Sequence, residues 1–386
     1  MGGIARRKLQ SVTFHNPDKA YKGYTFFAPF WEQSRAFLID MEGRFVNYWQ
    51  LPGRPGEITY MLENGNIMYP SRLTIKDSPI FDGFCGCDLL EVDWDGNTVW
   101  SYHDERQHHT TQRLKNGNTM LLRAIETPQD LAEKVKGGQP DTYDRGKMWS
   151  CELREVDTAG KIVWEWKAYE HLDPEVDSFC PLEHRSEWTH GNSIEELPNG
   201  DILTCFRYPS LVVIIDKKTG NIKWKWGKDQ IFHPHNPTML DNGNILIFDN
   251  GVHRHDSYCD YSKCIEINPK TNEIEWEYKG SPLTEFYSSV SASCQRLPNG
   301  NTLICEATKG RLFEVTYEGE LVWEYMVPFS APGTSGWAEF NLGKNSFTHR
   351  AYRYDPDMAG FKDKDMDPGK FQALNDLYGP DAFCCS

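Results

Sequence analysis

Apolar and polar residues alternate along short stretches of the chain, and Asn-Gly sequences separate these stretches in pairs. Alternation with a period of two is typical of strands that bury one face. Asn-Gly between two such stretches indicates a hairpin, because both turn positions favour a positive φ. Five segments have this pattern: LENGNIMY (62–69), LKNGNTMLL (114–122), LPNGDILTC (197–205), LDNGNILIF (240–248) and LPNGNTLIC (297–305). The chain is therefore predicted to be rich in β-hairpins.

A second pattern alternates with these hairpins and ends in a tryptophan. It consists of a polar residue, a turn sequence and a short apolar stretch, and its tryptophans are Trp49, Trp100, Trp164, Trp224, Trp276 and Trp323. Their spacing of about 50–60 residues and the four strands per unit are typical of propeller blades. The sequence therefore predicts an all-β fold, a six-bladed β-propeller in a single domain over 1–386, with the tryptophans packed between blades.

The blades are predicted to occupy about 20–354, and three segments depart from the repeat. The insertion 124–150 contains the helix-like stretch PQDLAEKVK, and an irregular stretch covers 169–188. Loops of this length on one face of a propeller commonly cover its channel. The last unit has FNLGKNSFTHRAYRY (340–354) in place of a hairpin, so the chain ends are expected to close the ring in one blade. Residues 355–386 form a C-terminal tail with the helix-like GKFQALNDLYG.

Composition narrows the range of partners. The 386 residues include 41 basic and 56 acidic ones, which gives a net charge of −15. This charge opposes binding to nucleic acid and to anionic membranes. No apolar stretch is long enough for a membrane span or follows the N-terminal basic residues as a signal would, so we expect a cytoplasmic protein. The sequence leaves open whether the protein forms a homo-oligomer.

Eleven cysteines without regular spacing do not indicate a disulfide framework. Those within apolar strand-like stretches are expected to act as small hydrophobic residues: Cys205, Cys264, Cys294 and Cys305. The close pairs Cys85/Cys87 and Cys384/Cys385 could oxidise or bind a metal.

Polar residues recur at matched positions before the turn glycines. His109, Asn192 and His235 stand eight residues before the glycine of their unit, and His190 and His233 stand ten before it. The strand before each Asn-Gly turn is expected to line the central channel, and positions two apart share a face of a strand. These side chains are therefore predicted to converge in the channel.

The matched positions of two other units are mainly apolar: Pro55, Glu57, Val290 and Ala292. Polar groups are thus expected on one side of the channel, as in a binding site. Four histidines lack matched positions and are expected to be structural or surface residues: His15, His103, His171 and His184. His253 and His255 lie in a Gly-containing loop, where exposure to solvent is the expectation.

Several of these segments carry a family resemblance. WTHGNSIEELPNGDILTCFR, FHPHNPTMLDNGNILIFDNG and the closing RAYRY resemble the arylsulfotransferases that work without a nucleotide sulfate donor. The resemblance covers about 20–354 and implies a six-bladed propeller. It also implies transfer of a sulfuryl group from an aryl sulfate to a phenol, both small aromatic molecules, through a covalent sulfohistidine and without a cofactor.

The resemblance also implies roles for individual residues. His235 matches the nucleophilic histidine, and His190, Asn192 and Arg207 match residues that hold the sulfuryl oxygens. His109, or its neighbour His108, matches a further histidine that acts as acid or base. A neutral imidazole is a competent nucleophile, and an arginine stabilises charge on the transferred oxygens.

Two other functions stay open. In a metal-dependent lyase, hydrolase or oxygenase, His109, His190 and His235 would bind one divalent ion together with His349 or His233. In a non-catalytic propeller, the channel would only bind a ligand.

Overall fold

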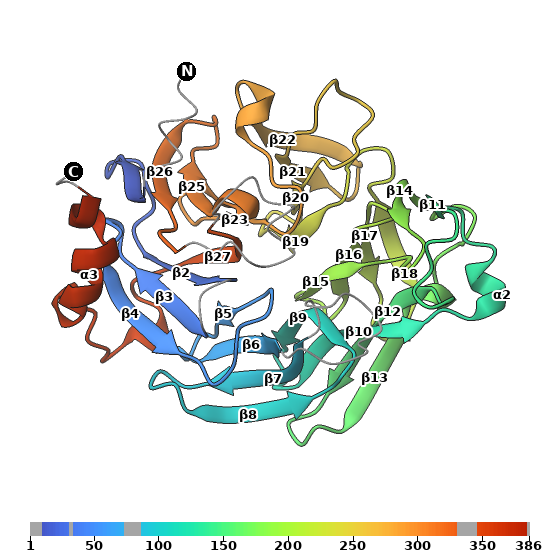
Figure 1. The fold of residues 1–386 in the computed structure, drawn as a ribbon, viewed down its shortest axis with the longest axis horizontal. Helices are drawn as coiled ribbons and strands as arrows, with labels where there is room; N and C mark the ends of the chain where they lie inside the picture. Colours follow the sequence, from blue (N-terminus) through green and yellow to red (C-terminus); the bar gives the residue numbers. More distant parts are fainter. Residues whose placement is uncertain (1–9, 31–33, 73–85, 330–345, 384–386) are drawn as a thin grey trace.

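The computed structural model describes residues 10–30, 34–72, 86–329 and 346–383. Six antiparallel sheets surround a central axis, so the predicted six-bladed β-propeller is confirmed (Figure 1). The strand that precedes each Asn-Gly turn is the innermost strand of its blade, as predicted.

From the channel outward, the strands of the first three blades are as follows. The first blade contains β27 (Thr348–Tyr354), β2 (Tyr24–Pro29), β3 (Arg35–Ile39) and β4 (Phe45–Gln50). The second contains β5 (Tyr60–Met61), β6 (Ile67–Arg72), β7 (Gly86–Val92) and β8 (Thr98–His103). The third contains β9 (Gln107–Arg113), β10 (Thr119–Glu126), β12 (Trp149–Val156) and β13 (Ile162–Lys167).

The other three blades repeat this order. The fourth contains β15 (Gly191–Glu196), β16 (Ile202–Phe206), β17 (Leu211–Ile215) and β18 (Ile222–Trp226). The fifth contains β19 (His235–Met239), β20 (Ile245–Asp249), β21 (Lys263–Asn268) and β22 (Glu273–Lys279). The sixth contains β23 (Ser293–Arg296), β24 (Thr302–Glu306), β25 (Arg311–Val315), β26 (Leu321–Met326) and, at its outer edge, β1 (Ser11–His15).

The ring is closed at two places. Strand β27, late in the chain, forms the inner edge of the first blade by pairing with β2. Strand β1, early in the chain, pairs with β26 and adds a fifth strand to the sixth blade. The sequence predicts closure in one blade and a first blade that begins at about residue 20. The structure instead joins the chain ends in two adjacent blades, and the strand before residue 20 belongs to the ring.

The repeated tryptophans link each blade to the next. Each indole Nε1 donates a hydrogen bond to the turn between the two outer strands of the following blade, at distances of 2.7–3.1 Å. The six bonds run from Trp49 to Trp94 O, Trp100 to Thr158 O, Trp164 to Lys217 O, Trp224 to Asn272 Oδ1, Trp276 to Tyr317 O and Trp323 to Met41 O. They form a closed circle, because the sixth bond returns to the first blade.

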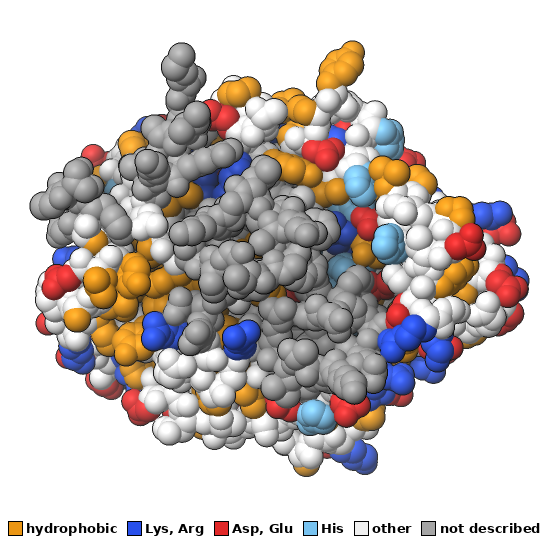
Figure 2. Space-filling model, in the orientation of Figure 1, with side chains coloured by type: hydrophobic (Ala, Val, Ile, Leu, Met, Phe, Trp, Pro, Cys, Tyr) orange, Lys and Arg blue, Asp and Glu red, His pale blue; other side chains and the backbone are white. Residues whose placement is uncertain are grey.

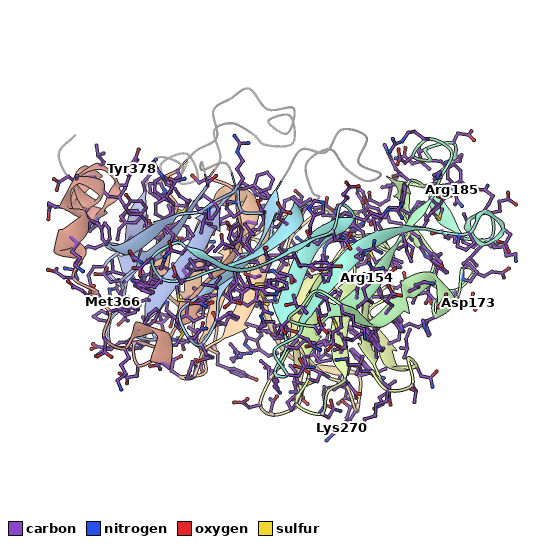
Figure 3. The ribbon with its side chains drawn as sticks, turned by 90° about the horizontal axis from the view of Figure 1, so that it is seen from below. Arg154, Asp173, Arg185, Lys270, Met366 and Tyr378 are labelled. Atoms are coloured by element: carbon purple, nitrogen blue, oxygen red, sulfur yellow. The ribbon has the colours of Figure 1, made fainter. Side chains whose placement is uncertain are left out.

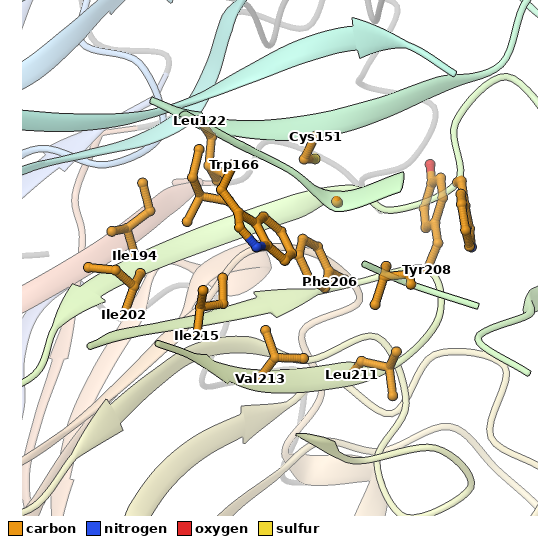
Figure 4. Close-up of a cluster of buried hydrophobic side chains, with 14 of the residues drawn as sticks. Leu122, Cys151, Trp166, Ile194, Ile202, Phe206, Tyr208, Leu211, Val213 and Ile215 are labelled. Atoms are coloured by element: carbon orange, nitrogen blue, oxygen red, sulfur yellow. The ribbon is translucent and has the colours of Figure 1, made fainter. Parts of the chain in front are cut away.

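Apolar side chains fill the spaces between neighbouring blades. In Figure 4, Leu122 and Trp166 of the third blade pack against Ile194, Phe206 and Val213 of the fourth. The buried free cysteines belong to such clusters, as predicted: Cys205, Cys264, Cys294 and Cys305. Of the close cysteine pairs, Cys85, Cys384 and Cys385 lie outside the described residues.

The insertion lies at the edge of the ring. Its helix α2 is short (Gln129–Ala132), and β11 (Gly137–Gln139) pairs in parallel with β14 (Phe179–His184). The Arg185 guanidinium holds the segment by donating to the carbonyls of Ala132 and Val135. The sequence predicts that the insertion covers the channel. Figure 1 instead places α2 at the periphery of the ring, so this prediction is wrong for the insertion.

The C-terminal tail packs along the outer side of the first blade. Helix α3 (Gln372–Tyr378) lies within the predicted helix-like stretch. The side chain of Asn375 in this helix exchanges hydrogen bonds with the backbone of Phe45. The remaining helices are single 3₁₀ turns: η1 (Ala168–Glu170), η2 (Leu283–Glu285), η3 (Ala307–Lys309), η5 (Ala359–Phe361), η6 (Pro368–Phe371) and η7 (Pro380–Phe383). Across the described ranges, every helix is too short or too polar to cross a bilayer.

The two rims of the ring differ. In Figure 3, the turn at Lys270 marks one rim and Arg185 the opposite one. Neighbouring strands of a blade are antiparallel, so the first and third strands, counted from the channel, run in the same direction. The Asn-Gly turns follow first strands and the Lys270 turn follows a third strand, so these turns lie on the same rim. The innermost strands therefore begin at the Arg185 rim, where the longer connections are.

We expect the indole bond of Trp323 to stabilise the ring closure. Substituting Trp323→Phe keeps an aromatic ring but leaves the Met41 carbonyl without its buried donor, which should lower the free energy of unfolding by about 1–3 kcal/mol. Urea denaturation measures this loss. Trp226→Phe, outside the circle of bonds, is the control, and an equal loss in both variants would argue against the bond.

Candidate active site

The candidate site lies where three innermost strands begin, at the rim opposite the Asn-Gly turns. Strands β9, β15 and β19 each contain a register shift there, at 108–111, 191–193 and 235–238. His109, His190 and Asn236 at these places have positive φ values of 50–54°. Bulges redirect side chains, and left-handed non-glycine residues cluster at functional sites. On this face, histidine side chains gather beside the centre of the ring (Figure 2).

Three histidines from two blades form a continuous chain of contacts. His109 Nε2 lies 3.1 Å from His190 Nε2, and His109 Nδ1 lies 2.7 Å from His108 Nδ1. Carboxylates contact this chain: Glu187 Oε2 lies 2.7 Å from His190 Nδ1, and Glu57 Oε2 lies 3.4 Å from His109 Nε2. A line of imidazoles with carboxylate partners is able to take up or release a proton.

The hydrogen bonds of His235 fix its tautomer. The Asn250 amide nitrogen donates to the carbonyls of Ser288 (2.7 Å) and Ser291 (2.9 Å), so the amide oxygen must face the imidazole. That oxygen lies 2.6 Å from His235 Nδ1. Because an amide oxygen only accepts, Nδ1 carries the proton and Nε2 holds the lone pair. In the neutral form of His235, Nε2 is therefore the nitrogen with the free lone pair.

Burial keeps these imidazoles neutral. It lowers the pKa of His108 to about 4 and that of His109 well below its ordinary value, with a further contribution from neighbouring His190. The pKa of His235 is also well below its ordinary value, through burial first and the positive charge of Arg207 second. These groups hold lone pairs at neutral pH rather than positive charge.

Two arginines place positive charge beside His235. Arg207 is buried, contacts Glu183 at 3.4 Å, and its Nε has no hydrogen-bond partner among the described residues. Arg350 on β27 reaches across the channel and donates from its guanidinium to the Asn192 carbonyl at 3.0 Å. Both charges lower the pKa of His235. Arg207 is predicted from the sequence as a site residue, whereas Arg350 is not.

Asn192 holds the backbone beside His235. Its amide nitrogen donates to the carbonyl of Pro234 at 2.8 Å, and its amide oxygen accepts from the Cys205 thiol at 2.8 Å. Pro234 directly precedes His235 in the chain. Asn192 thus contributes to the position of His235, in addition to any contact with a substrate.

The two residues ten positions before the turn glycine, His190 and His233, have different hydrogen-bond partners. His190 contacts His109, whereas His233 lies 2.9 Å from Glu183 and its Nδ1 donates to the Val252 carbonyl. His233 therefore belongs to a second cluster at the rim, and the convergence of His190 and His233 stays a prediction.

The remaining histidine of interest, His349, is buried and close to the channel. Its Nδ1 lies 2.6 Å from Ser291 Oγ, and Phe30 and Phe347 contact its ring edge-on. Its charge, when protonated, would lower the pKa of His109. Within the described parts of the chain, the ligand atoms that converge within 4.8 Å are those of Cys180, His233 and His253, and the channel histidines form no such group.

Sequence reasoning missed several partners of the site. Glu57 stands at the matched register in a unit that the sequence analysis treats as mainly apolar, so this signal was available. Glu187 and Asn250 lie in connections outside the repeat and have no matched register. Tyr208, which stacks on His190 at 4.6 Å between ring centroids, follows Arg207 directly but shows no pattern of its own.

Comparison with known proteins gives a family. Residues 60–327, which cover more than half of the chain, match the family described as arylsulfotransferase (ASST). The chain belongs to the arylsulfotransferase family. This confirms the family that the motifs around His190 and His235 resemble. A comparison with curated proteins gives no match.

Two solved structures are similar to this arylsulfotransferase-family protein. A protein of unknown function from Bacteroides caccae has 14% identity and a TM-score of 0.53, over 86% of this chain and 99% of that chain. A virginiamycin B lyase from Staphylococcus aureus has 12% identity and a TM-score of 0.40, over 70% and 69% of the two chains. At 14% identity, the similarity to the Bacteroides caccae protein concerns the fold alone.

We expect His108 of this arylsulfotransferase-family protein to make stability depend on pH. The unfolded chain protonates this histidine below about pH 6.5, whereas the folded protein does so only near pH 4, so unfolding takes up a proton in between. The contribution of His108 is thus lost as the pH falls from 6.5 to 4. In His108→Gln, the slope of the unfolding free energy against pH should decrease by about 1.4 kcal/mol per unit. Urea titrations across this range test it. The exposed His103→Gln is the control, because it removes a histidine that lies outside the site.

Proposed function

We propose that the protein transfers a sulfuryl group from an aryl sulfate to a phenolic acceptor, with His235 as the nucleophile. The observation that carries this proposal is the bond from His235 Nδ1–H to Asn250 Oδ1, which leaves Nε2 as the lone-pair nitrogen. Membership of the arylsulfotransferase family supports the reaction class.

In the first step, Nε2 of His235 attacks the sulfur of the aryl sulfate. A nitrogen–sulfur bond forms, the sulfur–oxygen bond to the aryl group breaks, and the phenolate leaves with the electron pair. The phenolate takes its proton from solvent, because the buried imidazole of His109 is neutral. In the second step, the acceptor phenol gives its proton to the paired imidazoles of His109 and His190, which release it to solvent, and the phenol oxygen takes the sulfuryl group from His235.

The basic groups stabilise the negative oxygens during transfer. Arg207 lies close enough to His235 to lower its pKa, and its buried Nε remains available for a sulfuryl oxygen. Arg350 adds a second positive charge from the opposite side of the channel. Charge fixed in a buried site acts without the reorganisation that solvent would need.

A metal-dependent reaction of the channel histidines has less support. His109 and His190 contact each other through their Nε2 atoms, and His235 is oriented by an amide oxygen. A channel that only binds a ligand stays as the alternative that the first experiment distinguishes.

We expect His235→Ala to lose sulfuryl transfer by at least about 10³-fold, because no covalent intermediate forms. A chromogenic aryl sulfate with phenol acceptors measures the rate. The wild type, quenched during turnover with the donor, should gain the mass of one acid-labile sulfuryl group that the variant does not gain. His103→Ala is the control. Undiminished transfer in His235→Ala would overturn the proposal.

Asn250 should set the rate through the tautomer of His235. In Asn250→Ala, Nδ1 loses its acceptor and the productive tautomer is no longer favoured, so kcat should fall by about 10²–10⁴-fold with little change in KM. Asn250→Asp keeps an acceptor oxygen and should retain more activity than Asn250→Ala. If both variants lose activity equally, the carboxamide does not act through the tautomer. Thermal denaturation of both variants checks that the fold is kept.

A further inference from the structure

Four side chains with metal-binding atoms converge at the channel rim, beside the proposed active site. Cys180 and Glu183 come from β14, His233 precedes β19, and His253 follows β20. We call these four residues the rim cluster. The ligand atoms of the cysteine and the two histidines lie within 4.8 Å of one another.

The distances within the rim cluster fit one small cation. Cys180 Sγ lies 3.3 Å from His253 Nδ1, and Glu183 Oε1 lies 2.9 Å from His233 Nε2 and 3.8 Å from His253 Nδ1. Ligands bound at about 2.0–2.3 Å in a tetrahedral arrangement are about 3.3–3.8 Å apart, by the geometry of known zinc sites. Small movements of the side chains would therefore complete such a site.

A neutral His233 ring has no proton on Nε2 with which to form a hydrogen bond to Glu183. His233 Nδ1 donates its hydrogen to the Val252 carbonyl at 2.9 Å, so a neutral ring presents the bare lone pair of Nε2. Nε2 is buried without a hydrogen-bond partner within the described residues, and it faces a carboxylate oxygen. A cation between the two groups would satisfy both.

The surroundings resemble those of built metal sites. Histidine ligands commonly donate their second ring N–H to a carbonyl, as His233 does. Both His233 and His253 have positive φ values, 60° and 56°. This backbone conformation is unfavourable for a residue other than glycine and is often found at functional sites, where the surrounding structure maintains it. His253 is 30% exposed, which leaves a path for an ion to enter from solvent.

We propose that the rim cluster binds one Zn²⁺ ion. A thiolate, two imidazoles and a carboxylate suit this borderline-soft ion and are poor ligands for Mg²⁺ or Ca²⁺. On binding, the Cys180 thiol releases one proton to solvent and its sulfur forms the metal bond. The thiolate and the Glu183 carboxylate then balance the two positive charges of the ion.

The ion would also act on Arg207, and this step depends on the proposed function. Glu183 contacts the Arg207 guanidinium at 3.4 Å in addition to the two histidines. When Zn²⁺ takes the Glu183 carboxylate, more of the Arg207 charge is available to a sulfuryl oxygen. Glu183 is therefore a positioning residue that connects the rim cluster to the transfer site.

The test uses the full chain without an affinity tag, stripped with a chelator and titrated with Zn²⁺ or Co²⁺. We expect binding of one equivalent, and the Co²⁺ form should show a thiolate-to-cobalt absorption band that reports the Cys180 sulfur. Zn²⁺ should raise the melting temperature of the wild type, because a ligand of the folded state stabilises it. Mg²⁺ should not.

Two pairs of variants make the test specific. His253→Ala and Cys180→Ser should weaken Zn²⁺ binding at least about 10-fold, and Cys180→Ser should remove the thiolate band. Their controls, His255→Ala and Cys259→Ser, change neighbours outside the cluster and should bind as the wild type does. Equal binding by His253→Ala and the wild type, or no stoichiometric binding at all, would overturn the proposal.

The outcome is separable from that of the proposed function. Transfer activity without Zn²⁺ binding would reject the rim cluster alone. Stoichiometric Zn²⁺ binding with no sulfuryl transfer would support the cluster and reject the proposed reaction.

Discussion

The structure depends on the circle of indole hydrogen bonds that joins each blade to the next. A single blade has one sheet and cannot bury both faces alone, so each blade needs its neighbours on both sides. The bond from each outer tryptophan to a turn of the following blade fixes the angle between the two sheets. The bond from Trp323 to Met41 closes the circle between residues distant in sequence. Strands β1 and β27 strengthen the same joint, because they carry the chain ends into neighbouring blades.

A ring fixed at its circumference places six inner strands around one axis, and the site uses only one end of them. At that end the bulges in β9, β15 and β19 turn polar side chains toward one another. The strained backbone at His109 and His190 is offset by the packing of the surrounding blades. Arg350 on the first blade donates a hydrogen bond to the Asn192 carbonyl of the fourth blade, which joins two opposite sides of the ring. The rigid outer ring thus supports a polar, strained centre.

The buried histidines of this site are organised by hydrogen bonds that select one tautomer of each neutral ring, and not by ion pairs. Burial opposes positive charge on His109 and His235, so each ring must donate from one nitrogen and accept at the other. In the rings of His235 and His233, a fixed acceptor selects Nδ1 as the donor and leaves Nε2 to accept. This acceptor is Asn250 for His235 and the Val252 carbonyl for His233. The same rule underlies both proposals, a nucleophilic nitrogen of His235 in the channel and a metal-binding nitrogen of His233 at the rim.

The sequence by itself determined the number of blades, the place of the inner strands and the contact between blades. These depend on local signals: strand alternation, Asn-Gly turns and a tryptophan in each unit. The aligned turns also selected His109, His190 and His235 as channel residues. Only the tertiary structure decided that His233 turns to Glu183, that Arg350 crosses the channel and that Asn250 orients His235. The physical reason is that bulges break the simple alternation of strand faces, and that these partners come from different blades, where no sequence spacing encodes their distance.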